Sequence, residues 1–195
     1  MPITIPDVSH YEKITIDPAA LASPALINKV SQGGSFVDQT WHNRSRNILE
    51  HKKLIGGYLF ATGDRPSDQV TLFLTTVMGA LGHTSLPQLK LAVDYEPNPE
   101  NQCSQRQAEQ IVSAITLATG KKPLLYMDYS MWQGAVHSSV LMSCDLWLAE
   151  YGPVAKAPYK LWQYTDSASI KGINVPCDAS LWQGSLVSLT RWWKT

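Results

Sequence analysis

The chain is poor in charge and has no long apolar run. Charged residues make up 16% of its 195 positions, and 16 basic side chains balance 16 acidic ones. We find no basic stripe, which argues against nucleic acid as a partner. No apolar run approaches the roughly 18 residues of a membrane span, which argues against a membrane protein. The N-terminus, MPITIPDVSH, lacks the basic and apolar regions of a secretory signal, so we expect synthesis in the cytoplasm without a leader.

Cysteine and phenylalanine are also scarce, whereas tryptophan and tyrosine are not. The three cysteines (Cys103, Cys144 and Cys177) are far apart and form no CxxC or Cys/His cluster, so we expect neither a metal site nor a cofactor. Seven Trp and eight Tyr stand against three Phe. Amphipathic aromatic side chains of this kind suit a cleft that stacks on sugar rings, and equally an ordinary core.

Strand and helix patterns alternate along the chain, which we expect to form one domain over residues 1–195. The patterns predict five strands with helices or turns between them, then short helical turns and three further strands joined by loops. This order favours an α/β barrel or an open parallel sheet. The tail, RWWKT, reads as a terminal strand or a packed end, with Trp192 and Trp193 closing the barrel. The expected strands are 3–9, 25–31, 56–61, 90–94, 123–127, 145–151, 159–164 and 173–177, and the expected helices are 40–53, 67–81 and 104–119, with a short one beginning at Asp17-Pro18.

Two acids at the end of one strand give the first indication of chemistry. Asp94 and Glu96 are two positions apart, so in a strand both side chains point the same way. Their mutual repulsion would raise the pKa of at least one of them, which is how a carboxylic acid stays protonated for general-acid work. The alternative is a solvated strand end without function.

Two more acids are expected at the same edge of the sheet. Asp7 ends the first predicted strand, and Asp178 follows the last one. In a barrel, functional groups gather at the carboxyl ends of the strands. If the sheet closes, Asp7, Asp94, Glu96 and Asp178 therefore meet at one mouth.

At this point the chain resembles the lysozymes of glycoside hydrolase family 25, the Chalaropsis-type N-acetylmuramidases. Its landmarks occur in the family's order over nearly the whole chain. They are DVSHYE (7–12), KVSQG (29–33), GGYLF (56–60), DYE (94–96), LWLAEY (146–151), WQYT (162–165) and the late Cys177-Asp178. The resemblance implies a flattened TIM-like barrel of about five β/α units followed by three strands.

The resemblance also implies an activity and roles for residues. The expected reaction is cleavage of the β-1,4 bond between N-acetylmuramic acid and N-acetylglucosamine in peptidoglycan. Glu96 would be the general acid, Asp94 would assist the substrate's N-acetyl group, and Asp7 and Asp178 would flank them. Residues expected to line the cleft are Tyr58, Tyr126, Trp147, Gln163 and Tyr164, with Lys29 either a ligand or an ion-pair partner of an acid. Trp147, Trp162 and Tyr164 could equally belong to the core.

Departures from the family pattern leave alternatives open. Gln32 replaces a usual Glu, and Leu59 replaces a usual His. There are two alternatives. One is a carbohydrate-binding barrel that has lost catalysis, and the other is a hydrolase of another N-acetylhexosamine polymer such as chitin. We expect peptidoglycan glycan strands as the partner and a monomeric protein, with an immunity or delivery protein possible. Phage lysis or a secretion machine would bring it to the cell wall.

Overall fold

A computed structural model of the chain describes residues 2–11 and 14–195. Glu12, the last residue of the DVSHYE motif, lies outside the described residues. The strands are β1 (Ile3–Val8), β2 (Ala25–Gln32), β3 (Phe36–Val37), β4 (Leu54–Phe60), β5 (Lys90–Asp94), β6 (Leu124–Asp128), β7 (Leu146–Ala149), β8 (Leu161–Ala168) and β9 (Cys177–Trp182). The helices are α1 (Trp41–Glu50), α2 (Pro66–Leu81), α3 (Gln105–Thr119), α4 (Tyr129–Ala135) and α5 (Leu186–Trp193), with short 3-10 helices η1 (His83–Gln88) and η2 (Leu141–Ser143).

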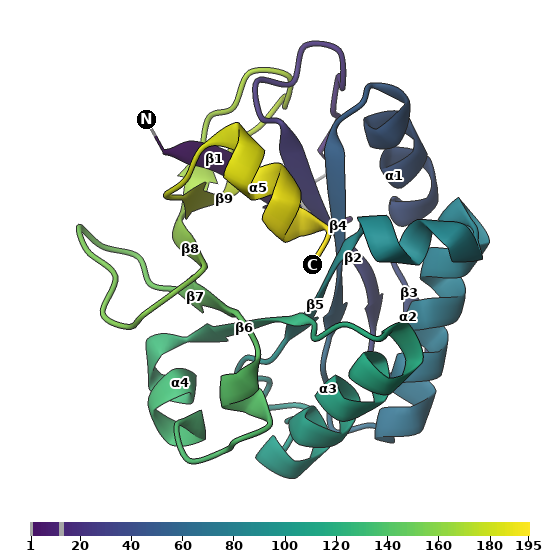
Figure 1. Cartoon of the computed structure of the whole chain (residues 1–195), viewed down its shortest axis with the longest axis vertical. Helices are drawn as coiled ribbons and strands as arrows, with labels where there is room; N and C mark the ends of the chain where they lie inside the picture. Colours follow the sequence, from purple (N-terminus) through teal and green to yellow (C-terminus); the bar gives the residue numbers. More distant parts are fainter. Residues whose placement is uncertain (1, 12–13) are drawn as a thin grey trace.

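The strands close into a barrel. The sheet runs in the order β1-β9-β8-β7-β6-β5-β4-β2-β3, and β1 also pairs with β2. All pairings from β1 through β2 and β4 to β8 are parallel, whereas β9 is antiparallel to both of its neighbours. β3 is a short addition to the end of β2. The predicted barrel is therefore confirmed, and the open sheet is excluded. In Figure 1, α1, α2 and α3 lie outside the ring of strands on one side.

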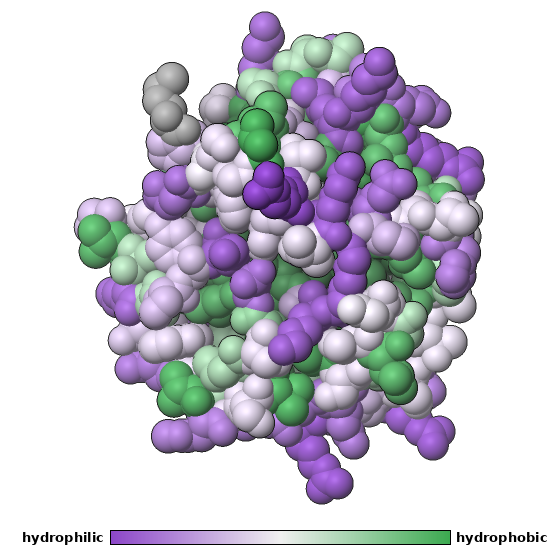
Figure 2. Space-filling model, viewed as in Figure 1, coloured by the Kyte–Doolittle hydropathy of each residue, from purple (hydrophilic) through white to green (hydrophobic). Residues whose placement is uncertain are grey.

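Alternation along the strands creates two cores. Residues facing the barrel interior, such as Ile5, Ile27 and Leu124, pack together with Trp193 of α5. Residues on the other face of the strands, such as Val30 and Val93, pack under the helices. α5 crosses one end of the barrel, the end seen in Figures 1 and 2, where hydrophilic and hydrophobic side chains are mixed. The other end holds the carboxyl ends of the parallel strands.

Local sequence signals explain where the helices begin and end. Ser104 and Gln107 form a capping box at the start of α3, and Gly120 ends the helix with a left-handed φ of 72°. At the start of α2, Pro66 occupies the first turn and Arg65 is the N-cap residue, so the helix begins one residue before the expected start at Ser67. In the described ranges, no helix is long and apolar enough to cross a membrane.

Three expectations about elements are corrected by the structure. The last strand is Cys177–Trp182 and not 173–177, because Ile173 forms only an isolated bridge with Ile16. The tail is a helix, α5, which begins where the Ser185 side chain accepts a hydrogen bond from the Ser188 amide. Asp17 accepts hydrogen bonds from the amides of Ala19 and Ala20, as a cap would, but the segment stays a turn.

Candidate active site

The four predicted acids meet in one pocket at the carboxyl end of the parallel strands. Its volume is about 260 Å³. It also holds Tyr58, Tyr126, Trp147, Gln163 and Lys29, so all but one of the residues predicted for the site are brought together. The full lining is Asp7, Ser9, Tyr11, Lys29, Tyr58, Phe60, Asp94, Glu96, Tyr126, Trp147, Tyr151, Gln163 and Asp178.

Asp178 reaches the pocket in a way that the sequence did not predict. It lies inside β9 and does not follow the last strand. Because β9 is antiparallel to its neighbours, its first residues, and not its last, lie at the mouth. Asp178 is directly opposite Asp7 in the β1–β9 register. The expected meeting of the two acids is therefore correct, although the reasoning about the strand end is wrong.

Asp94 and Glu96 form an electrostatically strained pair. Asp94 is 8% exposed, and its Oδ1 atom has no hydrogen-bond partner among the described residues. Burial, followed by the negative charges of Glu96, Asp7 and Asp178, raises the pKa of Asp94 well above its ordinary value, against the opposing charge of Lys29. Burial also raises the pKa of Glu96, with Lys29 opposing and Asp128 adding to the increase. The pair therefore holds a proton at a higher pH than solvated acids do.

Gln163 connects Asp7 to two tyrosines. Its Nε2 atom donates to Asp7 Oδ1 at 2.8 Å. Its Oε1 atom accepts from the hydroxyls of Tyr126, at 2.9 Å, and Tyr151, at 3.1 Å. With both lone pairs of the amide oxygen in use, the amide has one orientation, and its NH₂ group faces Asp7. Asp7 is thus positioned by a buried neutral donor.

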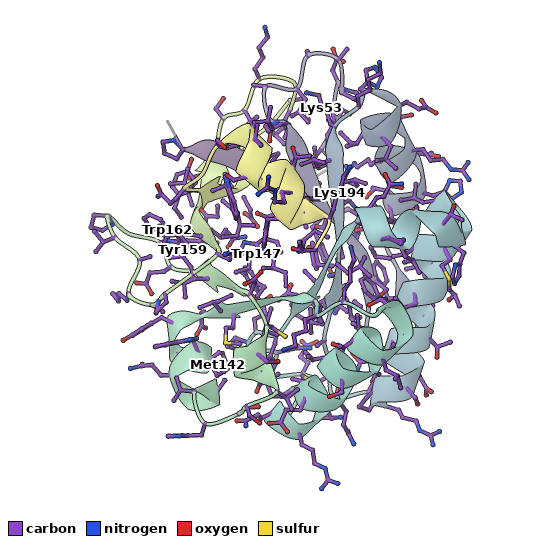
Figure 3. The ribbon with its side chains drawn as sticks, viewed as in Figure 1. Lys53, Met142, Trp147, Tyr159, Trp162 and Lys194 are labelled. Atoms are coloured by element: carbon purple, nitrogen blue, oxygen red, sulfur yellow. The ribbon has the colours of Figure 1, made fainter. Side chains whose placement is uncertain are left out.

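Trp147 supports the carboxylate of Asp7 indirectly, through the hydroxyl group of Ser180. Its indole Nε1 donates to Ser180 Oγ at 2.8 Å, and Ser180 Oγ lies 3.5 Å from Asp7 Oδ2. The Trp147 ring meets Tyr126 edge-on at 4.9 Å. Trp147 is 2% exposed and also lines the pocket, so it belongs to both the core and the cleft. In Figure 3 it lies within the ring of strands.

Lys29 brings a positive charge to the acid pocket. Although it is a lysine, it is only 3% exposed. Its Nζ atom donates to Gln32 Oε1 at 2.6 Å and lies 4.7 Å from the centre of the Phe60 ring. Its charge lowers the pKa values of Asp94 and Glu96 against the effect of burial. Lys29 therefore lines the pocket and acts electrostatically on the acids.

Sequence reasoning placed one residue wrongly and missed others. Tyr164 is not among the pocket's lining residues; its ring packs against the core and lies 6.2 Å from Trp162. Four lining residues were not predicted, namely Ser9, Tyr11, Phe60 and Tyr151. Phe60 could have been found, since it is two positions after Tyr58 on the same strand. Tyr151 is two positions beyond the end of β7, in the LWLAEY motif.

Two other hollows show why size alone does not locate the site. One of about 350 Å³ includes Leu146, the first residue of β7, and Lys160, the residue before β8. It therefore lies at the opposite ends of these strands from the acids. Met142 and Tyr159 of this hollow are labelled in Figure 3. A second of about 480 Å³ adjoins the acid pocket and shares Tyr151 with it. In the described part of the chain, no group of three or more His, Cys, Asp or Glu side chains is arranged to hold a metal ion.

Among curated proteins, the chain is similar to bacterial sequences of greater length. It is 25% identical over 170 residues to the uncharacterized protein YegX of Escherichia coli (strain K12), which covers 83% of this chain and 60% of that protein. It is 26% identical over 153 residues to an autolytic lysozyme of Clostridium acetobutylicum, covering 77% of this chain and 46% of that protein. The chain thus spans less than two thirds of the length of these relatives.

Among solved structures, the fold matches over the whole chain. A bacterial lysozyme from Streptomyces coelicolor superposes with a TM-score of 0.84 at 18% identity, covering 100% of this chain and 98% of that one. The catalytic domain of endolysin ply40 from bacteriophage P40 of Listeria monocytogenes gives 0.83 at 22% identity, with the same coverage. At these identities the likeness establishes the fold.

The sequence pattern of one family covers most of the chain. The pattern described as Glycosyl hydrolases family 25 matches residues 6–173. This stretch includes Asp7, Asp94 and Glu96, whereas Asp178 lies beyond it and is placed by the barrel geometry. The resemblance seen in the sequence motifs is confirmed: the chain belongs to glycosyl hydrolase family 25.

Proposed function

We propose that this chain hydrolyses peptidoglycan, cutting the β-1,4 bond between N-acetylmuramic acid and N-acetylglucosamine. The observation that carries the proposal is the pair of Asp94 and Glu96, both with raised pKa, in a pocket with two further carboxylates. Two neighbouring carboxyl groups are the usual machinery of glycoside hydrolysis. Family membership and the similarity to an autolytic lysozyme support the choice of substrate.

Glu96 acts as the general acid in this proposal. It is only partly buried, so a substrate oxygen can approach it, whereas Asp94 is buried deeper. Its pKa, raised by burial, increases the protonated share of the carboxyl at any given pH, which favours proton donation to a leaving oxygen. When the bond between C1 and the glycosidic oxygen breaks, that oxygen takes the proton from Glu96.

Asp94 assists the substrate's own N-acetyl group. The carbonyl oxygen of that group attacks C1 as the leaving sugar departs, and the positive charge that develops on the acetamido group is stabilised by Asp94. Water then attacks C1, gives a proton to Glu96 and releases the acetamido oxygen. One water is consumed, Glu96 is restored to its acid form, and the configuration at C1 is retained. The unpartnered Oδ1 atom of Asp94 suits this role.

Mass analysis of the fragments released from purified peptidoglycan tests the proposal. A muramidase leaves N-acetylmuramic acid at the new reducing ends, and chemical reduction followed by mass analysis identifies that sugar. Reducing-end N-acetylglucosamine would contradict the bond assignment. Release of sugars from chitin but not from cell walls would favour the other polymer. Binding to walls without any release would indicate a carbohydrate-binding barrel.

A further inference from the structure

The acid pocket is too small to hold a glycan strand on its own. Its volume of about 260 Å³ falls below the roughly 300–1,000 Å³ of typical ligand sites. The adjoining hollow of about 480 Å³ lies within that range. Its walls come from the ends of β6 and β7 and the residues after them, including Asp128, Tyr129 and Glu150. A polymer cut at Glu96 needs a place for a sugar on each side of the bond.

Tyr151 is the residue that lines both hollows. Its side chain is half exposed, at 52%, yet its hydroxyl group is anchored on the buried amide of Gln163. Gln163 is 2% exposed and is itself fixed by Tyr126 and Asp7. An exposed ring held by a buried partner has a defined position at low entropic cost, which suits recognition.

The chemistry of the open hollow matches a sugar ring. Tyr129 and Tyr151 offer aromatic surface, and the Tyr129 ring is steadied by stacking on Trp132 at 5.8 Å. Ala149, with its small side chain, also lines this hollow. The carboxylates of Asp128 and Glu150 can accept hydrogen bonds from hydroxyl and amide groups. Glu150 is held by Lys156 at 2.5 Å.

Glu96 lies near the junction of the two hollows. It lines the acid pocket, and the charge of Asp128, which lines the open hollow, raises its pKa. A glycosidic oxygen beside Glu96 would therefore place one sugar in each hollow.

We propose that Tyr151 is a specificity-determining residue whose ring divides the cleft into a deep site for the sugar under attack and an open site for the neighbouring N-acetylhexosamine, with Gln163 as the positioning residue of that ring. This inference rests on the proposed function. It predicts that the protein discriminates against substrates too short to fill both sites.

A matched pair of tyrosine variants tests the role of Tyr151. Tyr151→Phe and Tyr126→Phe each remove one hydroxyl donor from the same Gln163 oxygen, but only Tyr151 borders the open hollow. With solubilised peptidoglycan, we expect Tyr151→Phe to raise the half-saturating concentration about threefold to tenfold, more than it lowers the maximal rate. Tyr126→Phe should instead lower the maximal rate, because it loosens Gln163 against Asp7. Tyr151→Ala should raise the half-saturating concentration about tenfold or more. Tyr159→Phe, in the distant hollow, is the control for general damage.

A binding measurement separates this inference from the proposed function. In a Glu96→Gln background, co-sedimentation with purified peptidoglycan should weaken about tenfold with Tyr151→Ala and less than twofold with Tyr159→Phe. If the unaltered protein cuts peptidoglycan but Tyr151→Ala changes neither binding nor half-saturation, the inference is wrong and the function stands. Equal half-saturation effects of Tyr151→Phe and Tyr126→Phe would likewise overturn it, since Tyr151 would then act only through Gln163. Failure of the unaltered protein to release fragments, with Tyr151-dependent binding intact, would overturn the function alone.

Discussion

At the residue scale, Asp94 shows how the site works against the stability of the fold. The side chain is 8% exposed, its Oδ1 atom has no hydrogen-bond partner in the described part of the chain, and three other acids act on it. Burying a carboxylate in this way is unfavourable. This unfavourable burial suits a site that stabilises a developing positive charge. A carboxyl group that already accepted hydrogen bonds from the protein would interact less strongly with the charged substrate.

The raised pKa of Asp94 predicts how stability changes with pH. Between the ordinary value of 3.8 and the higher folded-state value, the folded protein binds more protons than the unfolded chain. The contribution of Asp94 to the free energy of unfolding therefore falls as pH rises above about 4. Asp94→Asn removes this contribution, so the variant should become increasingly more stable than the unaltered protein from pH 4 upward. Melting temperatures measured from pH 4 to 8 check this, with the exposed Glu100→Gln as a control that should run parallel to the unaltered protein. A constant gap across this range would contradict the burial of a strained carboxyl.

Glu96→Gln should separate catalysis from folding at the same site. The substitution keeps size and removes the proton donor, so the rate of lysis should fall on the order of 10²–10⁴-fold. Because Glu96 also has a raised pKa, the variant should fold at least as stably as the unaltered protein at neutral pH. Turbidity loss of cell walls measures the rate, and thermal melting measures the fold. Near-normal lysis by a well-folded variant would remove Glu96 from the mechanism.

At the element scale, two glycines show where the barrel and its helices leave no room. A Cβ atom on Gly57 of β4 would lie 2.7 Å from Val30 of β2 and 3.0 Å from the Trp41 ring of α1. The strand can pack against α1 this closely only because the side chain is absent. A Cβ atom on Gly79 of α2 would meet nothing within 4 Å.

Alanine at these two glycines should have opposite effects. We expect Gly57→Ala to reduce the free energy of unfolding by about 1–3 kcal/mol through overpacking. Gly79→Ala should increase it by roughly 0.5–1 kcal/mol, because alanine favours the helix and loses less entropy on folding. Urea denaturation of both variants measures the difference. A neutral Gly57→Ala would show that α1 can move away from the sheet without cost.

How well each element could be predicted depended on whether its pattern was local. α3 was predicted closely because the capping box and Gly120 are adjacent in sequence to its apolar stripe. β9 was misplaced because two of its inward-facing residues, Asp178 and Ser180, are polar. The sequence of β9 therefore lacks the alternation of apolar and polar residues by which a strand is recognised. The tail was expected to be a terminal strand or a packed end, and the second expectation is correct, because Trp192 and Trp193 pack on the barrel end. Its helical form was missed because tryptophans favour strands locally.

The residues of the site could likewise be predicted only where their pattern was local in the sequence. Asp94 and Glu96 were found from their spacing, and Asp7 from its place at the end of a strand. The network through Gln163 could not be found, because it joins β1, β6, β8 and the segment after β7, whose approach depends on closure of the sheet. Tyr164 was misassigned because it neighbours Gln163 in sequence but faces the other side of the strand.

At the scale of the whole molecule, the barrel separates function and stability to opposite ends. The mouth is lined by charged and polar side chains together with aromatic ones, whereas α5 fills the other end with tryptophan and leucine side chains. Trp193 is completely buried there, and its indole Nε1 donates to the carbonyl oxygen of Ile55 at 2.9 Å. Trp192 stacks on Trp182 at 4.8 Å and donates to Asp145. α5 thus contacts the start of β4, the residue before β7 and the end of β9, which lie on different sides of the ring.

Removing Trp193 should therefore cost stability and spare the chemistry. Ile55 is the second residue of β4, and the pocket residues Tyr58 and Phe60 lie further along the same strand, so the indole does not reach the acids. Trp193→Ala should reduce the free energy of unfolding by about 3–5 kcal/mol, through the cavity and the lost hydrogen bond. Val187→Ala, on the same helix but 72% exposed, should change it by less than about 0.5 kcal/mol. Urea denaturation gives both values, and the rate of lysis per folded molecule, measured at low temperature, should be the same in both variants. A Trp193→Ala protein that keeps its stability but loses its rate would mean that the closed end of the barrel shapes the acid pocket directly, and the two ends could not be treated as independent.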